Sequence, residues 1–190
     1  MKVTIRLAGQ TPLLVHNARL ANPTDPIARA MKAISSKRTK TDSDFETLAR
    51  LEFDGGLYYH PDLGPYLPGA NIAKSIAEGG VVTKRGKAVE RSLLVTDFEV
   101  PILYAGPRDP DGLWNDGYFD VASVKVGTSR VMRTRPAFRQ WAFEAQAELA
   151  TDVLNLDALR DVAKDAGRLV GIGDGRRLGF GRYEAEIEKS

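Results

Sequence analysis

The amino-acid sequence predicts an α+β fold whose core follows the order strand, helix, strand, strand, helix, strand. The first observation behind this prediction is that apolar residues alternate with polar ones near the beginning and the end of the chain, as in half-buried strands. The second is that two segments between them place apolar residues at helical spacing and end at glycines. The chain has 190 residues, 43% hydrophobic and 27% charged, which suits a folded core with room for an insert.

The six core elements follow from local patterns. Apolar and polar residues alternate from Val3 to Leu7 and again from Trp141 to Leu149. Asn155 is expected to cap the second helix and Gly167 to end it. The elements are expected over residues 2–8, 70–78, 93–103, 141–149, 156–166 and from 183 onward. This order is that of the ferredoxin-like split βαβ arrangement, written βαββαβ.

An inserted helical lobe is expected between the first strand and the first core helix. The core then takes residues 1–16 and 66–190, and the lobe takes residues 17–65. Asp25-Pro26 has the residues of a helix start, with aspartate as cap and proline in the first turn. A second helix is expected to open at Thr41 or Asp42.

A protruding β-hairpin is expected at about residues 117–136, where two alternating runs flank Gly127-Thr128. Its return arm carries Arg130, Arg133 and Arg135. Because a strand buries charge poorly, we expect this arm to project into solvent.

Composition excludes several classes of function. The chain has no cysteine, which removes disulfides, zinc–thiolate sites and cysteine nucleophiles. It has no run of about eighteen apolar residues, and its first residues alternate like a strand instead of forming a signal peptide. We therefore expect a cytoplasmic protein with no membrane partner. Its two histidines and its acidic residues lack metal-ligand spacing, so neither a metal nor a cofactor is expected.

The most informative stretch is the glycine-rich run over residues 170–183. Successive glycine amides can form a concave anion site, and Arg176, Arg177 and Arg182 add donors suited to phosphate. The run does not match a dinucleotide fingerprint, because Arg176 occupies the sixth position, and it lacks the Gly-Lys-Ser/Thr of a Walker loop. A simple connecting turn with arginines in solvent is the alternative.

Two motifs resemble the RAMP superfamily, the repeat-associated RNA-binding proteins of CRISPR systems. Gly171-Ile172-Gly173 followed by Gly179-Phe180-Gly181-Arg182-Tyr183 is similar to the glycine-rich signature of that family. The run from Tyr66 to Lys74 resembles the opening of the family's first core helix, although Ala70-Asn71 replaces two small hydroxyl residues and Ser75 replaces a glycine. The resemblance covers residues 1–9 and 66–188 and leaves the lobe unexplained.

The resemblance implies a modified RNA-recognition-type (RRM) core. Within the superfamily the chain is most similar to the backbone (Cas7-type) subunit of effector complexes, which polymerises along a guide RNA and carries a helical lobe and a hairpin thumb. A stand-alone or virus-encoded relative is equally compatible. The implied partners are single-stranded RNA or DNA, further copies in a head-to-tail oligomer or filament, and other effector-complex subunits.

Basic segments support binding of a strand without sequence preference, because each neutralised phosphate releases condensed counterions. The net charge is only +2, so this prediction depends on the clustering of basic residues and not on the total charge. Residues 84–91 are expected to be a basic loop, because they contain Gly86 and lack an apolar period. The alternative is a solvated basic surface. The expected nucleic-acid-binding residues are Lys37, Arg38, Lys40, Lys74, Lys84, Arg85, Lys87, Arg130, Arg133, Arg135, Gly173, Arg176, Arg177 and Arg182.

Two other functions stay open. RAMP relatives that cleave RNA place a histidine or aspartate near the first strand, and His16 is the candidate general acid or base here. A lone histidine is more often structural, so we expect a binding protein and keep an endoribonuclease as the alternative. The third possibility is a scaffold whose arginines contact protein. Tyr58 and Tyr59 could stack on bases, although packing is the favoured interpretation.

Overall fold

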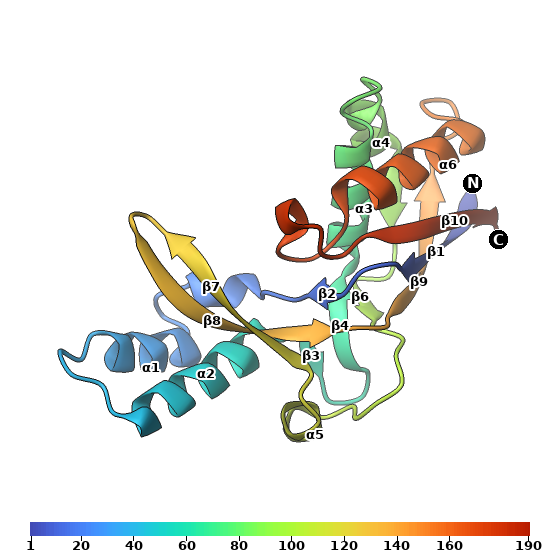
Figure 1. Cartoon of the computed structure of the whole chain (residues 1–190). Helices are drawn as coiled ribbons and strands as arrows, with labels where there is room; N and C mark the ends of the chain where they lie inside the picture. The colour runs from blue at the N-terminus through green and yellow to red at the C-terminus, as the bar shows by residue number, and fades with distance from the viewer.

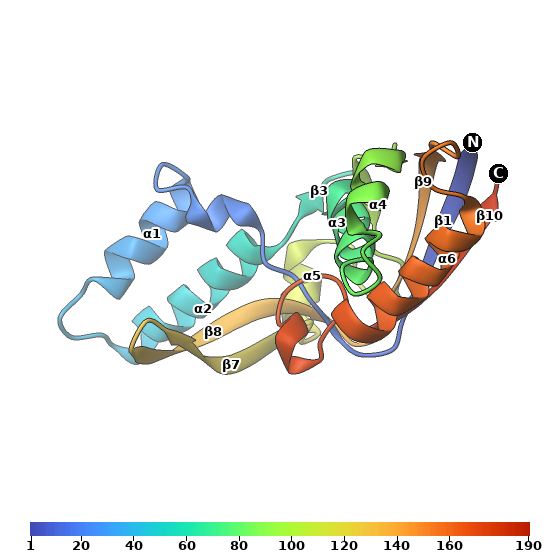
Figure 2. The ribbon, with the colours of Figure 1, turned by 90° about the horizontal axis from the view of Figure 1, so that it is seen from above.

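The computed structural model describes the backbone of residues 1–190 and all side chains except those of Val126 and Ser129. Its central feature is an antiparallel sheet in the order β10-β1-β9-β5. Helices α3 (Gly69–Gly79) and α6 (Leu156–Asp165) pack together over one face of this sheet (Figures 1 and 2). The strands are β1 (Lys2–Gly9), β5 (Leu93–Val95), β9 (Ala142–Leu149) and β10 (Tyr183–Lys189). The protein is therefore an α+β fold, as the sequence predicts.

Alternating burial explains why the core strands form. Ile5 on β1 lies opposite Ala145 on β9 and Ile187 on β10, and all three are buried under the helices. The residues between them are charged or polar and face away. A half-covered sheet imposes this period of two, and the strands expected over residues 2–8 and 141–149 are confirmed.

The second core helix begins as predicted and ends differently. The side chain of Asn155 accepts a hydrogen bond from the amide of Ala158 at 2.8 Å, so the predicted cap is confirmed. Gly167 does not end the helix: the chain continues through a π turn, η2 (Ala166–Val170), and first turns to positive φ at Gly171. Gly167 serves close packing instead, because a Cβ there would lie 2.0 Å from the carbonyl oxygen of Tyr183.

The segment between β1 and α3 holds two helices at the end of the molecule away from the core sheet (Figures 1 and 2). Asp25 caps α1 (Pro26–Ser35), and Thr41 and Asp44 form a capping box at the start of α2 (Asp42–Gly56). The remaining elements of this stretch are β2 (Leu13–Leu14), η1 (Ala18–Ala21), β3 (Tyr59–His60) and β4 (Gly64–Pro68).

The predicted hairpin is present as β7 (Phe119–Val126) and β8 (Ser129–Phe138). At its base β8 pairs with β2, which gives a sheet in the order β2-β8-β7. Helix α2 packs along β8, so the hairpin is supported by the helical segment (Figure 1).

Residues 93–103 differ from the prediction of one strand. They form β5 and, after a break, β6 (Glu99–Pro101), which joins the separate sheet β3-β4-β6. Leu94 and Phe98 are 60% and 84% exposed, whereas Val100 and Ile102 are buried, so these four residues do not share one face as a single strand would require. At the break the side chain of Asp97 accepts the amide of Gln146 at 2.8 Å, so a side chain takes the place of the next backbone partner on this strand.

The basic segment after α3 also differs from the prediction. Residues 84–91 are expected as a loop, but Gly86–Ser92 forms helix α4. Gly86 is required by packing, since a Cβ there would lie 2.7 Å from the carbonyl oxygen of Ala77. A further short helix, α5 (Pro110–Asn115), precedes the hairpin. Among the described residues, no helix is long and apolar enough to cross a membrane.

Candidate nucleic-acid interface

The glycine-rich loop, residues 171–182, runs from η2 to β10 through the short helix η3 (Arg176–Leu178). It lies against the chain's own backbone: a Cβ on Gly181 would stand 1.8 Å from the carbonyl oxygen of Ile172, and one on Gly173 would stand 2.4 Å from that of Leu14. Asp174 donates its amide to Leu14 at 2.8 Å. The glycines therefore allow the loop to dock on β2.

Most amides of this loop are already bound within the protein. The amide of Gly181 donates to the carbonyl of Pro12 at 2.8 Å, and that of Gly171 to Ala166 at 2.8 Å. The amide of Arg182 donates to the hydroxyl of Thr11 at 2.9 Å. The expectation of a concave anion site made of successive amides does not hold for these groups. The positive charge of this loop therefore comes from its arginine side chains.

A buried hydroxyl pair fixes the loop to α3. The Ser75 hydroxyl donates to the carbonyl of Gly171 at 2.8 Å, and the Tyr183 hydroxyl lies 2.9 Å from Ser75 Oγ. Burial raises the pKa of Tyr183 to about 12, so its hydroxyl stays protonated and can donate to Ser75. Each residue lies in one of the two sequence motifs, but their contact is not visible in the sequence because it joins distant segments.

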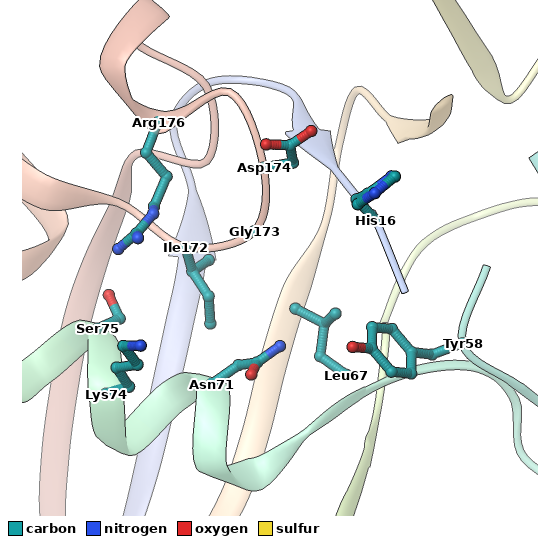
Figure 3. Close-up of a pocket in the computed structure, with 10 residues that line it drawn as sticks. All are labelled: His16, Tyr58, Leu67, Asn71, Lys74, Ser75, Ile172, Gly173, Asp174 and Arg176. Carbon is teal, nitrogen blue, oxygen red and sulfur yellow. The ribbon is translucent and has the colours of Figure 1, made fainter. Parts of the chain in front are cut away.

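Two neighbouring hollows lie between this loop, α3 and the hairpin. The first has a volume of about 240 Å³ and contains Lys74 and Arg176 in its wall (Figure 3). The second, of about 460 Å³, is lined by Arg133 and Arg135. His16 and Asp174 line both hollows, so the two adjoin at these residues. We call the combined feature the cleft.

Carboxylates hold most of the cleft's cations in place. Arg135 Nε lies 2.9 Å from Asp174 Oδ2, and only 13% of the Arg135 side chain is exposed. Arg133 pairs with Glu52, a buried side chain that also accepts the amide of Thr134 at 2.7 Å. The expectation that the return arm projects into solvent is therefore wrong for Arg135. Asp174 on the glycine-rich loop and Glu52 on α2 both lie against this arm.

Lys74 and Arg176 at the first hollow and Lys125 at the second complete the cationic lining. Arg176 pairs with Glu78, and both side chains stay about one-third exposed, at 34% each. Lys74 lies on the exposed side of α3 at the edge of the first hollow (Figure 3). Like Lys125, Lys74 has no carboxylate partner among the ion pairs of the described residues, so its charge can be removed without leaving a paired carboxylate behind.

His16 lies at the junction of the two hollows. Desolvation by surrounding atoms is the largest influence and lowers the pKa of its imidazole, although the side chain is partly exposed. Arg135 and Arg133 lower this pKa further, and Asp174 and Glu52 oppose them. The imidazole is therefore neutral at neutral pH and adds no charge to the cleft.

The lowered pKa of His16 predicts a contribution to acid sensitivity. Its unfolded-state pKa is near 6.5, the ordinary value for histidine, so on acidification the unfolded chain takes up this proton before the folded one and stability falls. Between neutral pH and about pH 5, wild type should lose more stability than His16→Gln. Urea unfolding at several pH values measures this, and parallel pH profiles for the two proteins would contradict it.

The other predicted binding residues lie outside the cleft. Lys37, Arg38 and Lys40 occupy the α1–α2 connection at the far end of the molecule (Figure 1), where Lys37 pairs with Asp44 at 2.6 Å. Arg182 lines a different hollow, beside Arg6. The remaining ones are exposed on the α3–α4 turn and α4, the hairpin tip and η3: Lys84, Arg85, Lys87, Arg130 and Arg177. The structure gathers Lys74, Arg133, Arg135, Gly173 and Arg176 with His16.

The open face of the core sheet is acidic. Arg6 on β1 lies between Glu144 on β9 and Glu186 on β10 and is bound by Glu144 and Glu188 at 2.8 and 2.6 Å. The exposed carboxylates of this face are Glu144, Glu148, Glu184, Glu186 and Glu188. RNA-recognition modules stack bases on aromatic side chains of their sheet. Among the described residues this face carries no aromatic side chain, and its negative charge would repel phosphate groups.

Other groups of the site carry no local sequence signal. Asp174 and Glu52 act through ion pairs with β8, and Asn71 enters the first hollow from α3. Tyr58 lines this hollow, whereas Tyr59 lines a separate one. In the described part of the chain, no three His, Asp or Glu side chains are grouped as metal ligands.

Comparison with known proteins yields similarity of fold. No family model and no curated protein sequence matches the chain. The structure is similar to a chain in a cryo-EM structure of a type III-B Cmr-beta complex bound to cognate target RNA, with a TM-score of 0.50 and 14% identity. This match covers 98% of the present chain and 59% of that chain.

A second solved structure, the crystal structure of Cmr6 from Pyrococcus furiosus, has a TM-score of 0.44 and 12% identity over 98% of both chains. The match to the Cmr-beta chain is a similarity of fold, and the present chain spans less than two thirds of that chain's length.

Proposed function

We propose that the chain binds single-stranded RNA along the cleft, as a subunit of a larger RNA–protein assembly. The observation that carries this proposal is the convergence of Lys74, Arg133, Arg135 and Arg176, from three distant segments, beside the glycine-rich loop. Such a line of cations suits a phosphate backbone. The chain of similar fold belongs to a complex bound to target RNA, which agrees with this choice of ligand.

The proposed core is the ferredoxin-like arrangement of RAMP proteins. Its support is the sheet order β10-β1-β9-β5, with α3 between β1 and β5 in sequence and α6 between β9 and β10, both on the same face. In this proposal residues 17–65 are an inserted lobe and the hairpin is a thumb resting on it. The acidic face of the sheet directs RNA away from the surface that RNA-recognition modules use.

Binding is expected to proceed by exchange of partners. A phosphate that enters the second hollow competes with Asp174 for Arg135, whose planar guanidinium can bind an oxyanion through two hydrogen bonds. Lys74 contributes a free ammonium at the edge of the first hollow. Contacts of this kind reach phosphate and not base edges, so they give little sequence preference.

The proposal is tested by the salt dependence of binding to a single-stranded oligoribonucleotide. Lys74→Gln should weaken binding and reduce the slope of log K against log salt by about 0.7, the value for one lost contact on a single strand. Lys2→Gln is the matched control, because it removes the same charge from the exposed end of β1 on the acidic face.

Equal slopes for wild type and Lys74→Gln would remove α3 from the interface. Failure of wild type to retain RNA at low salt would favour a scaffold instead. A single-stranded DNA of the same sequence, titrated in parallel, tests the choice of RNA. Fluorescence anisotropy of the labelled strand measures each affinity.

Assembly along the strand is the second part of the proposal. The edge strand β5 and the turn after it expose Leu94 and Phe98, and such apolar edges are typical of contact surfaces. Several copies are expected to lie head to tail on one RNA. Sedimentation velocity with RNAs of increasing length should show a stepwise increase in mass, and a constant one-to-one complex would contradict it.

Strand cleavage is the second candidate function. The observation that favours it is the neutral imidazole of His16 at the centre of the cleft, which is able to accept a proton at neutral pH. Incubating end-labelled RNA with wild type and His16→Ala decides between binding and cleavage. Fragments formed by wild type and not by the variant would establish an endoribonuclease, and intact RNA with both would leave binding alone.

A further inference from the structure

The first hollow of the cleft has two chemically different ends. Lys74 and Arg176 stand at one end, and the rings of His16 and Tyr58 at the other (Figure 3). Between them the floor is apolar, because Leu67 and Ile172 are almost completely buried. A nucleotide has the same division between an anionic phosphate and a flat aromatic base. Binding of a phosphate backbone alone would not require the apolar floor and the aromatic end of this hollow.

We infer that this hollow takes one base of the bound strand, turned out of the stack, while the adjoining phosphate stays at the mouth with Lys74. The inference rests on the proposed function and adds a base-binding subsite to it. Proteins that recognise single strands commonly hold a splayed base against an aromatic ring and bind its edge through hydrogen bonds.

The Asn71 side chain supplies the hydrogen-bonding group. Figure 3 shows it pointing into the hollow from the first turn of α3, between the cationic and the aromatic ends. The hydrogen bonds in the surrounding wall join Ser75 to Gly171 and Tyr183, and Arg176 to Glu78. The amide therefore faces the hollow with a donor and an acceptor, the pair of functions that a base edge also presents.

The walls are set before any base enters. The Tyr58 hydroxyl accepts the amide of Ala18 at 3.3 Å, and its ring leans on Tyr66 with 5.7 Å between ring centroids. Ser75 and Tyr183 fix the opposite wall to the loop. The hollow of about 240 Å³ is smaller than the roughly 300–1,000 Å³ of sites that enclose whole small-molecule ligands, so a base fits better than a complete nucleotide.

A thermodynamic cycle tests this subsite. Affinities are measured for a short oligoribonucleotide and for an abasic strand of the same length and charge, with wild type and with Tyr58→Leu/Asn71→Ala. Removing the bases should lower the affinity of wild type by a factor about ten times larger than for the double variant. This difference is the effect of one lost stacking and hydrogen-bonding contact. Stacking within the free strand cancels, because both proteins meet the same two strands.

Asn71→Ala alone is the second variant, since it removes a half-exposed amide without touching the packing of Tyr58. Its matched control is Asn115→Ala, at the exposed end of α5. The base-dependent loss should be smaller for Asn71→Ala than for wild type and unchanged for the control.

Equal base-dependent losses in wild type and both hollow variants would overturn the subsite while leaving the proposed function intact, provided that wild type still binds RNA with a slope that depends on Lys74. Absence of salt-dependent binding by wild type would instead overturn the proposed function and the subsite with it.

Discussion

Gly181→Ala is expected to lower the free energy of unfolding by about 3 kcal/mol or more, from left-handed backbone strain of about 1–2 kcal/mol and overpacking of about 1–3 kcal/mol. Gly181 has a φ of 68°, which side chains rarely adopt. An added Cβ would also stand 1.8 Å from the carbonyl oxygen of Ile172, a backbone atom that cannot turn aside. The same residues share a hydrogen bond of 2.9 Å from the Ile172 amide to the Gly181 carbonyl. Urea unfolding followed by circular dichroism measures the loss.

The matched control is Gly179→Ala in the same loop. Gly179 also has a positive φ, 92°, but nothing lies within 4 Å of an added Cβ. Only the backbone strain of about 1–2 kcal/mol is then expected. Equal losses of stability in the two variants would show that Gly181 is not needed for the close docking of the loop on itself and on β2.

Arg133→Met should destabilise the protein by about 2–3 kcal/mol, because it leaves the Glu52 carboxylate buried with only the Thr134 amide as partner. This value lies below the roughly 3–5 kcal/mol typical of a broken buried pair, since Arg133 keeps 37% of its side chain exposed. The loss would loosen the hairpin from α2, and truncating Arg133 therefore cannot measure phosphate contacts alone.

Rescue distinguishes the buried charge from a lost contact. Adding Glu52→Gln to Arg133→Met removes the unpaired charge and should restore most of the stability, while its amide oxygen can still accept the Thr134 amide. Arg6→Met is the control, because its pairs with Glu144 and Glu188 lie in solvent and should matter little. A double variant as unstable as Arg133→Met would show that Arg133 acts through packing.

Local sequence patterns predict those elements whose buried face or cap is set by residues within the element itself. The alternation from Val3 to Leu7 predicts β1, and Asn155 predicts the start of α6, because one covered face and one cap set each of them. The break within residues 93–103 is not predicted, since it depends on the side chain of Asp97 accepting the amide of Gln146 in the distant strand β9. Gly86 indicates a loop in the sequence, yet its small size serves helix packing.

The candidate site is predictable in its motifs and not in its partners. The glycine-rich run and Lys74 are visible in the sequence, and the structure places both at the cleft. The pairing of Glu52 with Arg133 and of Asp174 with Arg135 is not visible, because an ion pair between distant segments leaves no periodic trace. Those pairs decide which arginines are accessible, and so determine how the site must be tested.

Hydrogen–deuterium exchange with and without single-stranded RNA tests the location of binding most directly. The account predicts slower exchange in α3, β8 and the glycine-rich loop, which border the cleft. Exchange in β1 and β10, which carry the acidic face, should stay unchanged. Protection confined to the α1–α2 connection or to the sheet, with the cleft unaffected, would contradict the account.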